Sequence, residues 1–281
     1  MKHKFLFILL FSLVLEGMVT TQAVAGDYVH QVNTLIGTKG TGLTSGYLYP
    51  GATYPYGMVQ FTPSYFSKRS GFVINQLSGG GCEHMGNFPT FPVKGKLKMS
   101  PDNILNYRIN VSEEKGHAGY YEAMVQEDIK AKLTVTERTG MASYEYPADQ
   151  QYGTIIIGGG ISATPIEQAA IVITAPNKCE GYAEGGNFCG LRTPYKVYFV
   201  AEFDTDAFET GTWTREELMP NTTFAEGEYS GVYFTFDVNK KKNIQYKIGV
   251  SYVSVENARE NLKAENAEWD FQKIQNQAEA K

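Results

Sequence analysis

An alternating pattern in residues 244–255 restricts the fold more than any other feature of this sequence. Apolar or aromatic residues up to Tyr252, and a final Ser254, occupy every second position from Ile244, and Gln245, Lys247, Gly249, Ser251 and Val253 fill the positions between them. Successive side chains of a strand point to opposite faces, so this period of two predicts a half-buried antiparallel strand. Such a strand has to bury its apolar face against another layer of structure.

Shorter runs rich in β-branched and aromatic residues occur along much of the chain. They lie at residues 120–125, 131–136, 144–146, 152–157, 195–204 and 231–238. Segments with turn chemistry, such as 115–117 and 138–140, separate them. Many short strands at this spacing predict an all-β fold, a large antiparallel β-sandwich.

The last residues have a different character. Residues 256–281 lack Gly and Pro and are rich in Ala, Glu, Asn, Gln and Lys, which favours helix. Val255, Ala258 and Leu262 share one helical face. This register is lost near residues 269–270, so we expect two short C-terminal helices rather than one long helix.

Glycine, proline and aromatic residues crowd the stretch 32–92. Gly supplies backbone conformations with positive φ and Pro fixes φ near −65°, so the stretch predicts an array of tight loops. The interleaved Phe, Tyr, Met, Val and Ile need a core to pack into, and a flexible linker would lack them.

The first 25 residues have the three parts of an export signal. Residues 2–4 are basic, residues 5–15 are apolar apart from Ser12, and Ala23-Val24-Ala25 has the small-x-small form of a cleavage site. The apolar run is too short to cross a bilayer, which takes about 20 residues. We therefore expect an exported protein, periplasmic or extracellular, with the signal peptide cleaved after Ala25.

The composition restricts the classes of partner. The chain has 19 Tyr, 16 Phe and a formal net charge of −5, and its one basic cluster, residues 240–242, lies between two strand-like runs. Nucleic-acid binding calls for a basic patch, so we predict no nucleic-acid partner. Beyond the signal no apolar run approaches membrane length, and we predict no membrane span.

The three cysteines are an odd number for an oxidising compartment. Cys179 and Cys189 flank a Gly-rich segment, 180–188, which would bring them together if it were a loop. We expect a disulfide between these two and a free Cys82, with plain buried thiols as the alternative. No Cys-x-x-Cys or His pair at ligand spacing supports a zinc site, so we expect no metal in this chain.

Four phrases stand in an order typical of one enzyme family. They are Val32-Asn33 with Ile36-Gly37-Thr38; Pro50 through Gln60; Phe188-Cys189-Gly190 with Val197-Tyr198-Phe199 and Ala201-Glu202-Phe203-Asp204; and Gly249 through Ser254 with Glu256-Asn257-Ala258. Together they resemble glycoside hydrolase family 92, a family of α-mannosidases. The sequence departs from many relatives at Ile74 and Gln76, where those relatives have histidines.

The resemblance implies a fold and an activity. It implies an N-terminal β-sandwich, a galactose-mutarotase-like supersandwich, that packs on a helical (α/α) barrel. Such enzymes are calcium-dependent, exo-acting and inverting, and their catalytic acid, base and most calcium ligands belong to the helical domain. We therefore expect residues 26–254 to form the sandwich and residues 255–281 to form a helical linker leading to a barrel that has no counterpart here.

These implications set the expected function. The chain is predicted to be the non-catalytic, truncated N-terminal part of a secreted α-mannosidase, inactive alone, with calcium needed only by the full-length enzyme. Its expected partners are a mannose-containing glycan and the missing helical domain. The alternative is a stand-alone secreted carbohydrate-binding protein derived from that domain.

The carboxylates of this chain do not predict a catalytic pair. Inverting glycoside hydrolysis needs two carboxyl groups roughly 6.5–9.5 Å apart. The acidic pairs at 113–114 and 216–217 are adjacent in sequence, and adjacent side chains on a strand or loop point apart. We interpret them as solvated charges and expect no catalytic residue.

A polar set around the Gly-rich segment is the candidate carbohydrate site. Amide, carboxylate and imidazole groups bind vicinal hydroxyls, Gly lets the backbone approach a ligand, and Phe88 or Tyr47 would supply an aromatic face. The alternative is that the polar side chains serve the loop's own backbone groups. The candidate residues are Asn75, Gln76, Glu83, His84 and Asn87.

Overall fold

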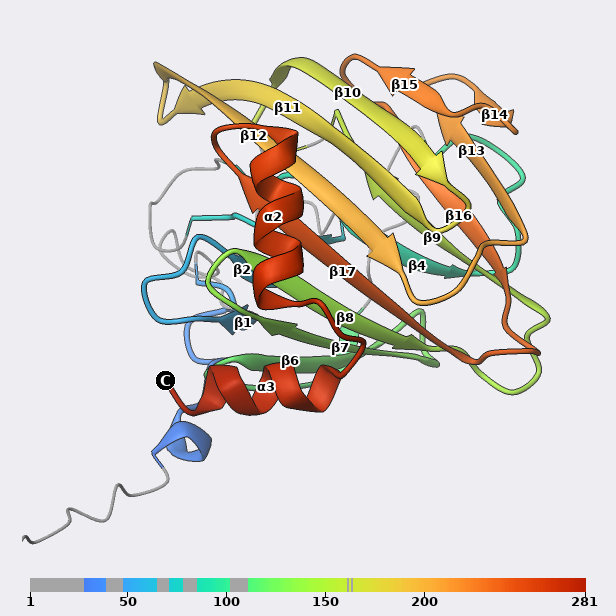
Figure 1. Ribbon diagram of the computed structural model, residues 1–281. Helices are drawn as coiled ribbons and strands as arrows, with labels where there is room; N and C mark the ends of the chain where they lie inside the picture. Colours follow the sequence, from blue (N-terminus) through green and yellow to red (C-terminus); the bar gives the residue numbers. More distant parts are fainter. Residues whose placement is uncertain are drawn as a thin grey trace, which may run out of the picture.

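The computed structural model describes residues 28–38, 48–64, 71–77, 85–101, 111–160, 162 and 164–281. The predicted signal peptide, Tyr47, Glu83 and His84 lie outside the described residues. Two large antiparallel sheets stack face to face, and two short helices cover part of one sheet (Figure 1). This arrangement confirms the predicted β-sandwich with short C-terminal helices.

Within the described residues, eight strands form the first sheet. In spatial order they are β1 (Ala52–Thr53), β2 (Gln60–Pro63), β3 (Phe72–Val73), β4 (Thr90–Lys94), β9 (Tyr152–Gly158), β16 (Gly231–Asp237), β13 (Glu209–Trp213) and β14 (Leu218–Pro220). The Gly-rich opening thus supplies β1 to β4, which are neighbours at one side of the sheet.

The second sheet has nine strands within the described residues. In spatial order they are β15 (Phe224–Glu226), β10 (Ile166–Ala175), β11 (Lys178–Phe188), β12 (Leu191–Phe203), β17 (Asn243–Ser251), β8 (Thr139–Glu145), β7 (Ile129–Val135), β6 (Tyr120–Val125) and β5 (Val111–His117). The alternation that predicted β17 is confirmed, because Ile244, Tyr246, Ile248 and Val250 are buried.

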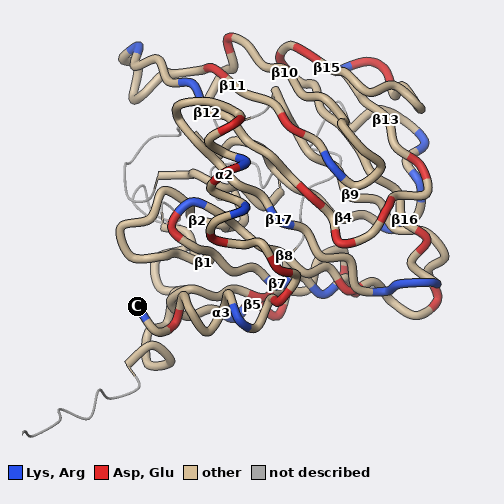
Figure 2. The backbone as a smooth tube through the Cα atoms, in the orientation of Figure 1, with Lys and Arg blue, Asp and Glu red and all other residues tan. Residues whose placement is uncertain are grey.

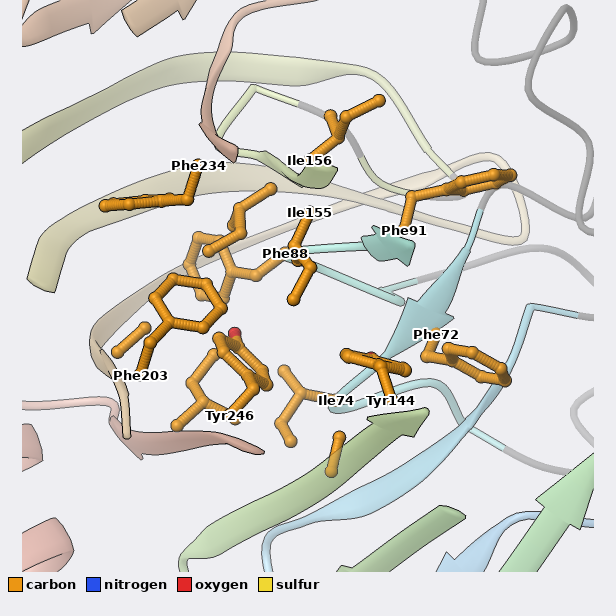
Figure 3. Close-up of a cluster of buried hydrophobic side chains, with 14 of the residues drawn as sticks. Phe72, Ile74, Phe88, Phe91, Tyr144, Ile155, Ile156, Phe203, Phe234 and Tyr246 are labelled. Carbon is orange, nitrogen blue, oxygen red and sulfur yellow. The ribbon is translucent and has the colours of Figure 1, made fainter. Parts of the chain in front are cut away.

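The hydrophobic core lies between the two sheets. Phe203, Phe234 and Tyr246 point toward one another there (Figure 3). The ring of Phe203 lies with its centroid 4.8 Å from that of Phe234 on the opposite sheet and 5.3 Å from that of Tyr246. Aromatic pairs at such distances add to the stabilisation that burial itself provides.

Helices α2 (Val255–Glu265) and α3 (Phe271–Glu279) pack on the outer face of the nine-stranded sheet, and a short 3₁₀ turn, η1 (Val29–Gln31), lies near β5 (Figure 1). The hydroxyl of Ser254 accepts a hydrogen bond from the backbone N–H of Asn257 and caps α2. Ala258 and Leu262 are buried against Val200 of β12. The predicted break between two short helices is confirmed.

The corner between α2 and α3 is bonded to the sheet through Lys247. The Nζ of this lysine donates to the carbonyl oxygens of Asn266 at 2.9 Å and Ala267 at 3.0 Å, and lies 4.2 Å from the centroid of the Trp269 ring. Burial lowers the pKa of Lys247, and the nearby Glu202 carboxylate opposes this effect.

The β7–β8 turn holds the same corner from the other side. The Oε2 of Glu265 accepts hydrogen bonds from the hydroxyl of Thr136 at 2.6 Å and from the backbone N–H of Arg138 at 2.9 Å. The guanidinium of Arg138 also pairs with Glu265. The helical segment is therefore tied to the sandwich at a buried lysine and at a carboxylate.

Acidic and basic residues are interspersed along the strands of the nine-stranded sheet and the helices (Figure 2). Lys178 pairs with Glu202 at 2.9 Å and Arg259 of α2 pairs with Glu180 at 2.6 Å. In the described part of the chain, no helix has the length and apolar character that crossing a bilayer requires.

The predicted Cys179–Cys189 disulfide is wrong. Cys179 is a free, fully buried thiol, whereas Cys189 is disulfide-bonded. The Gly-rich segment between them is strand β11 and not a loop, so the two residues lie roughly 30 Å apart at about 3.3 Å per residue. Cys82, the third cysteine, lies outside the described residues.

Candidate functional site

Four polar side chains from distant parts of the chain meet at one end of the sandwich. Asn75 follows β3, Asn87 precedes β4, Tyr195 lies in β12, and Tyr252 directly follows β17. The central strands of both sheets bring these residues together, because β4, β12 and β17 all begin or end at this side.

Asn75 and Asn87 form a reciprocal pair. The backbone N–H of Asn87 donates to Oδ1 of Asn75 at 2.7 Å, and Nδ2 of Asn75 donates to Oδ1 of Asn87 at 3.0 Å. Asn75 is 2% exposed and Asn87 is 0% exposed. At this depth the two hydrogen bonds fix the amide planes, since a buried amide left unpaired costs about 1–3 kcal/mol.

Two tyrosine hydroxyls extend the pair outward. The hydroxyl of Tyr195 donates to Oδ1 of Asn87 at 3.0 Å, and Nδ2 of Asn75 donates to the hydroxyl of Tyr252 at 3.3 Å. Burial raises the pKa of both tyrosines, and the hydrogen bonds with the asparagines partly offset this rise. Tyr252 is 39% exposed, so the network has one end in solvent. We call these four residues the Asn–Tyr network.

The backbone beside Asn87 is held in an unusual conformation. Met85, Gly86 and Phe88 have φ values of 58°, 75° and 53°, in the left-handed region. This region costs non-glycine residues roughly 1–2 kcal/mol each. Phe88 is nevertheless fully buried, with its ring centroid 4.2 Å from that of Phe199, and this packing holds the strained segment in place.

Two buried polar atoms next to the network have no hydrogen-bond partner within the described residues. They are Oε1 of Gln76 and Nδ2 of Asn87, an acceptor and a donor. Gln76 lies beside Gly86, where an added Cβ would stand 3.7 Å from the Cβ of Gln76. Strained backbone and unpaired polar groups in one place are typical of binding sites rather than of packing alone.

The structure thus brings together three of the five predicted carbohydrate-binding residues, Asn75, Gln76 and Asn87. All three are buried, and Glu83 and His84 lie outside the described residues. Sequence reasoning missed Tyr195 and Tyr252. Tyr252 continues the alternation of β17 and therefore looked like a core position.

Acidic residues of this chain either pair with groups of the fold or are exposed to solvent. The Oε2 of Glu114 accepts a hydrogen bond from the hydroxyl of Tyr121 at 3.1 Å, and Asp204 pairs with Lys241 at 2.7 Å. Glu216 and Glu217 are exposed in the turn after β13. Among the described residues no group of three or more His, Cys, Asp and Glu side chains is placed to hold a metal ion.

Comparison with known proteins identifies the family. Residues 31–251 match the model of the glycosyl hydrolase family 92 N-terminal domain. The chain belongs to glycoside hydrolase family 92. A protein of Arthroderma benhamiae described as an uncharacterized secreted glycosidase is 25% identical to it, over 96% of this chain and 40% of that relative.

Solved structures of the family show the same sandwich. A family 92 α-mannosidase from Bacteroides thetaiotaomicron is 24% identical with a TM-score of 0.78, over 90% of this chain and 37% of its own. A family 92 inverting mannosidase from the same organism is 24% identical with a TM-score of 0.77, over 90% of this chain and 35% of its own. This family 92 chain therefore spans about two fifths or less of the relatives it matches, and the likeness covers their sandwich fold.

Proposed function

We propose that this chain is the non-catalytic, carbohydrate-positioning part of a secreted family 92 α-mannosidase. It contributes to binding a mannose-containing glycan and shapes the outer sugar subsite, while a helical domain supplies the groups that cleave the glycosidic bond and that bind calcium. The observation that carries this proposal is the Asn–Tyr network, a buried and strained polar cluster that opens to solvent at one end.

In the Asn–Tyr network the buried and the exposed residues have different roles. Asn75 and Asn87 are too deeply buried to meet a sugar, so they act as positioning residues for Tyr195 and Tyr252. Tyr252 is 39% exposed, so in this proposal its ring meets the C–H side of a sugar while Asn75 holds its hydroxyl. Gln76 adds an unpaired amide oxygen behind them.

Apolar residues around the network support packing against a further domain. Leu77 and Val253 are exposed and lie within two residues of Asn75 and Tyr252 in sequence. Exposed apolar groups beside a polar site are typical of an interface that another domain covers. This favours a subsite completed by a helical domain over a stand-alone carbohydrate-binding protein, whose corresponding surface would be polar.

Export is part of the same proposal. The first 25 residues have the order of a cleavable signal, and the Arthroderma benhamiae relative is described as secreted. Cys189 is disulfide-bonded, which is consistent with an oxidising compartment.

The test is a calorimetric titration of the chain with methyl α-mannoside and with α-linked mannobioses. Tyr252→Ala is expected to weaken binding at least tenfold, because it removes the exposed end of the network. Val253→Ala is the matched control at the next position and is expected to stay within twofold of the unmodified chain. Equal affinity of the Tyr252→Ala variant, or no mannoside binding at millimolar concentration, would contradict the proposal.

A further inference from the structure

A second aromatic and polar cluster lies at the other end of the sandwich from the Asn–Tyr network. Strand β4 begins three residues after Asn87 and ends at Lys94, which pairs with Gly153 at the start of β9. Tyr152 therefore lies at the end toward which the arrow of β4 points (Figure 1). At about 3.3 Å per residue, β4 alone separates the two ends by about 13 Å.

The cluster is built around two rings. The centroids of Tyr152 and Phe208 are 5.2 Å apart, with the ring planes inclined by 37°. The Nζ of Lys96 lies 4.8 Å from the Tyr152 centroid and 4.5 Å from the Phe208 centroid, and 2.9 Å from Oε2 of Glu209. The side-chain amide of Gln151 donates to the hydroxyl of Tyr152 at 3.3 Å.

Backbone hydrogen bonds fix the positions of these side chains. The N–H of Gly95 donates to the carbonyl of Tyr152 at 2.8 Å, and the N–H of Phe208 donates to the carbonyl of Thr235 at 2.7 Å. The two rings and Glu209 then hold the ammonium of Lys96. A side chain held by several partners loses little further freedom when a ligand binds, which favours affinity.

An exposed phenylalanine in this setting calls for an explanation. Phe208 is 58% exposed, although burial of a Phe side chain stabilises a protein in proportion to the apolar area removed from water. Phe224 on β15 is similarly exposed at 54%, but within the described part of the chain it has no aromatic or cation contact of this kind. Single exposed apolar residues such as Phe224 are common on protein surfaces, whereas Phe208 packs in a cluster with Tyr152 and Lys96.

The chemistry of this group fits a sugar ring. An aromatic face packs against the C–H face of a pyranose, and the ammonium, carboxylate and amide beside it bind hydroxyls at the ring's edge. The Lys96–Glu209 pair carries one charge of each sign, so it does not favour an anionic or a cationic polymer. The ligand class is therefore a neutral polysaccharide.

We propose that Tyr152, Phe208, Lys96 and Glu209 form a second carbohydrate-binding surface, remote from the Asn–Tyr network, that takes one hexose unit of a neutral polysaccharide. Its role is to hold the polysaccharide at the end of the sandwich opposite the Asn–Tyr network. This goes beyond the proposed function and does not depend on it.

The experiment is native affinity electrophoresis of the 281-residue chain in gels containing a soluble α-mannan free of phosphate groups. The unmodified chain is expected to be retarded, and Phe208→Ala to weaken the retardation at least fivefold. Phe224→Ala is the matched control and is expected to behave like the unmodified chain. Because Phe208 is mostly exposed, its removal is expected to leave the midpoint of urea unfolding unchanged.

A further comparison of variants distinguishes binding at the two sites. Tyr252→Ala, which disables the first site, is expected to keep most of the retardation, and the double variant Tyr252→Ala/Phe208→Ala is expected to lose it. The proposal is overturned by an unretarded parent chain, by equal retardation of Phe208→Ala, or by an equal loss in Phe224→Ala. A loss in Phe208→Ala supports it even if Tyr252→Ala has no effect on methyl α-mannoside binding.

Discussion

Replacing Lys247 by Met removes the buried ammonium that joins the α2–α3 corner to the nine-stranded sheet. Methionine keeps most of the aliphatic stem, so packing under Trp269 is preserved while two hydrogen bonds and one cation–π contact are lost. The change therefore isolates the polar contribution of Lys247 to the attachment of residues 255–281.

The expected cost follows from the surroundings of the two carbonyl groups. Ala267 is exposed, and its carbonyl can be hydrated when the lysine is removed, but Asn266 is buried. One charge-assisted hydrogen bond contributes about 1.5–3 kcal/mol to stability. The variant no longer bears the desolvation cost of a buried ammonium, which offsets part of this loss. We expect Lys247→Met to lower the free energy of unfolding by about 2 kcal/mol, a fall of about 4–8 °C in Tm for a chain of this size.

The assay is urea unfolding followed by far-UV circular dichroism, with thermal unfolding as a second measure. Lys263→Met is the matched control, because Lys263 is an exposed lysine in the last turn of α2. This control is expected to change the free energy of unfolding by no more than about 0.5 kcal/mol. Equal stability of the two variants would refute the argument that Lys247 secures the helical corner.

Two further predictions concern buried groups. Burial raises the pKa of Tyr144, Tyr146 and Tyr246 above the ordinary value of 10.0. The stability that they contribute is therefore complete below pH 10 and is lost as pH rises above it, at about 1.36 kcal/mol per pH unit for each group. Ionisation of these tyrosines near pH 10 in a still-folded chain, measured by absorbance at 295 nm, would contradict this prediction. Burial also raises the pKa of the Cys179 thiol. We expect iodoacetamide to label Cys179 only after unfolding and Cys189 only after reduction. A disulfide-linked peptide that contains both residues would show that the strand geometry is wrong.

The sequence pattern predicted strands correctly where they are made of β-branched and aromatic residues that pack into the core. Residues 120–125 and 152–157 were placed as strands because β-branched and aromatic residues fill them, and they coincide with β6 and nearly all of β9. Strand β11 was missed because its glycines resemble a loop. An added Cβ at Gly181 would stand 2.1 Å from the carbonyl oxygen of Ala170, so glycine is required there by the close approach of β10, which the local sequence does not reveal.

The candidate site shows the same limit. Asn75 and Asn87 lie 12 residues apart within one polar, Gly-rich segment, and that proximity was the basis for placing both in the candidate site. Their tyrosine partners are 108 and 177 residues away along the chain, and only the pairing of β12 with β17 brings them to the same end of the sandwich. Lys247 was correctly predicted to face away from the core, but the helical corner that buries it could not be inferred from the alternation of β17.

Saturation-transfer difference NMR of the chain with α-linked mannobiose and calcium, with free mannose measured in the same sample, tests the central proposal most directly. The account predicts transfer of saturation to the sugar, its loss in Tyr252→Ala, and no release of mannose. Release of mannose by this chain would contradict a non-catalytic role, and the absence of saturation transfer would contradict a role in carbohydrate binding.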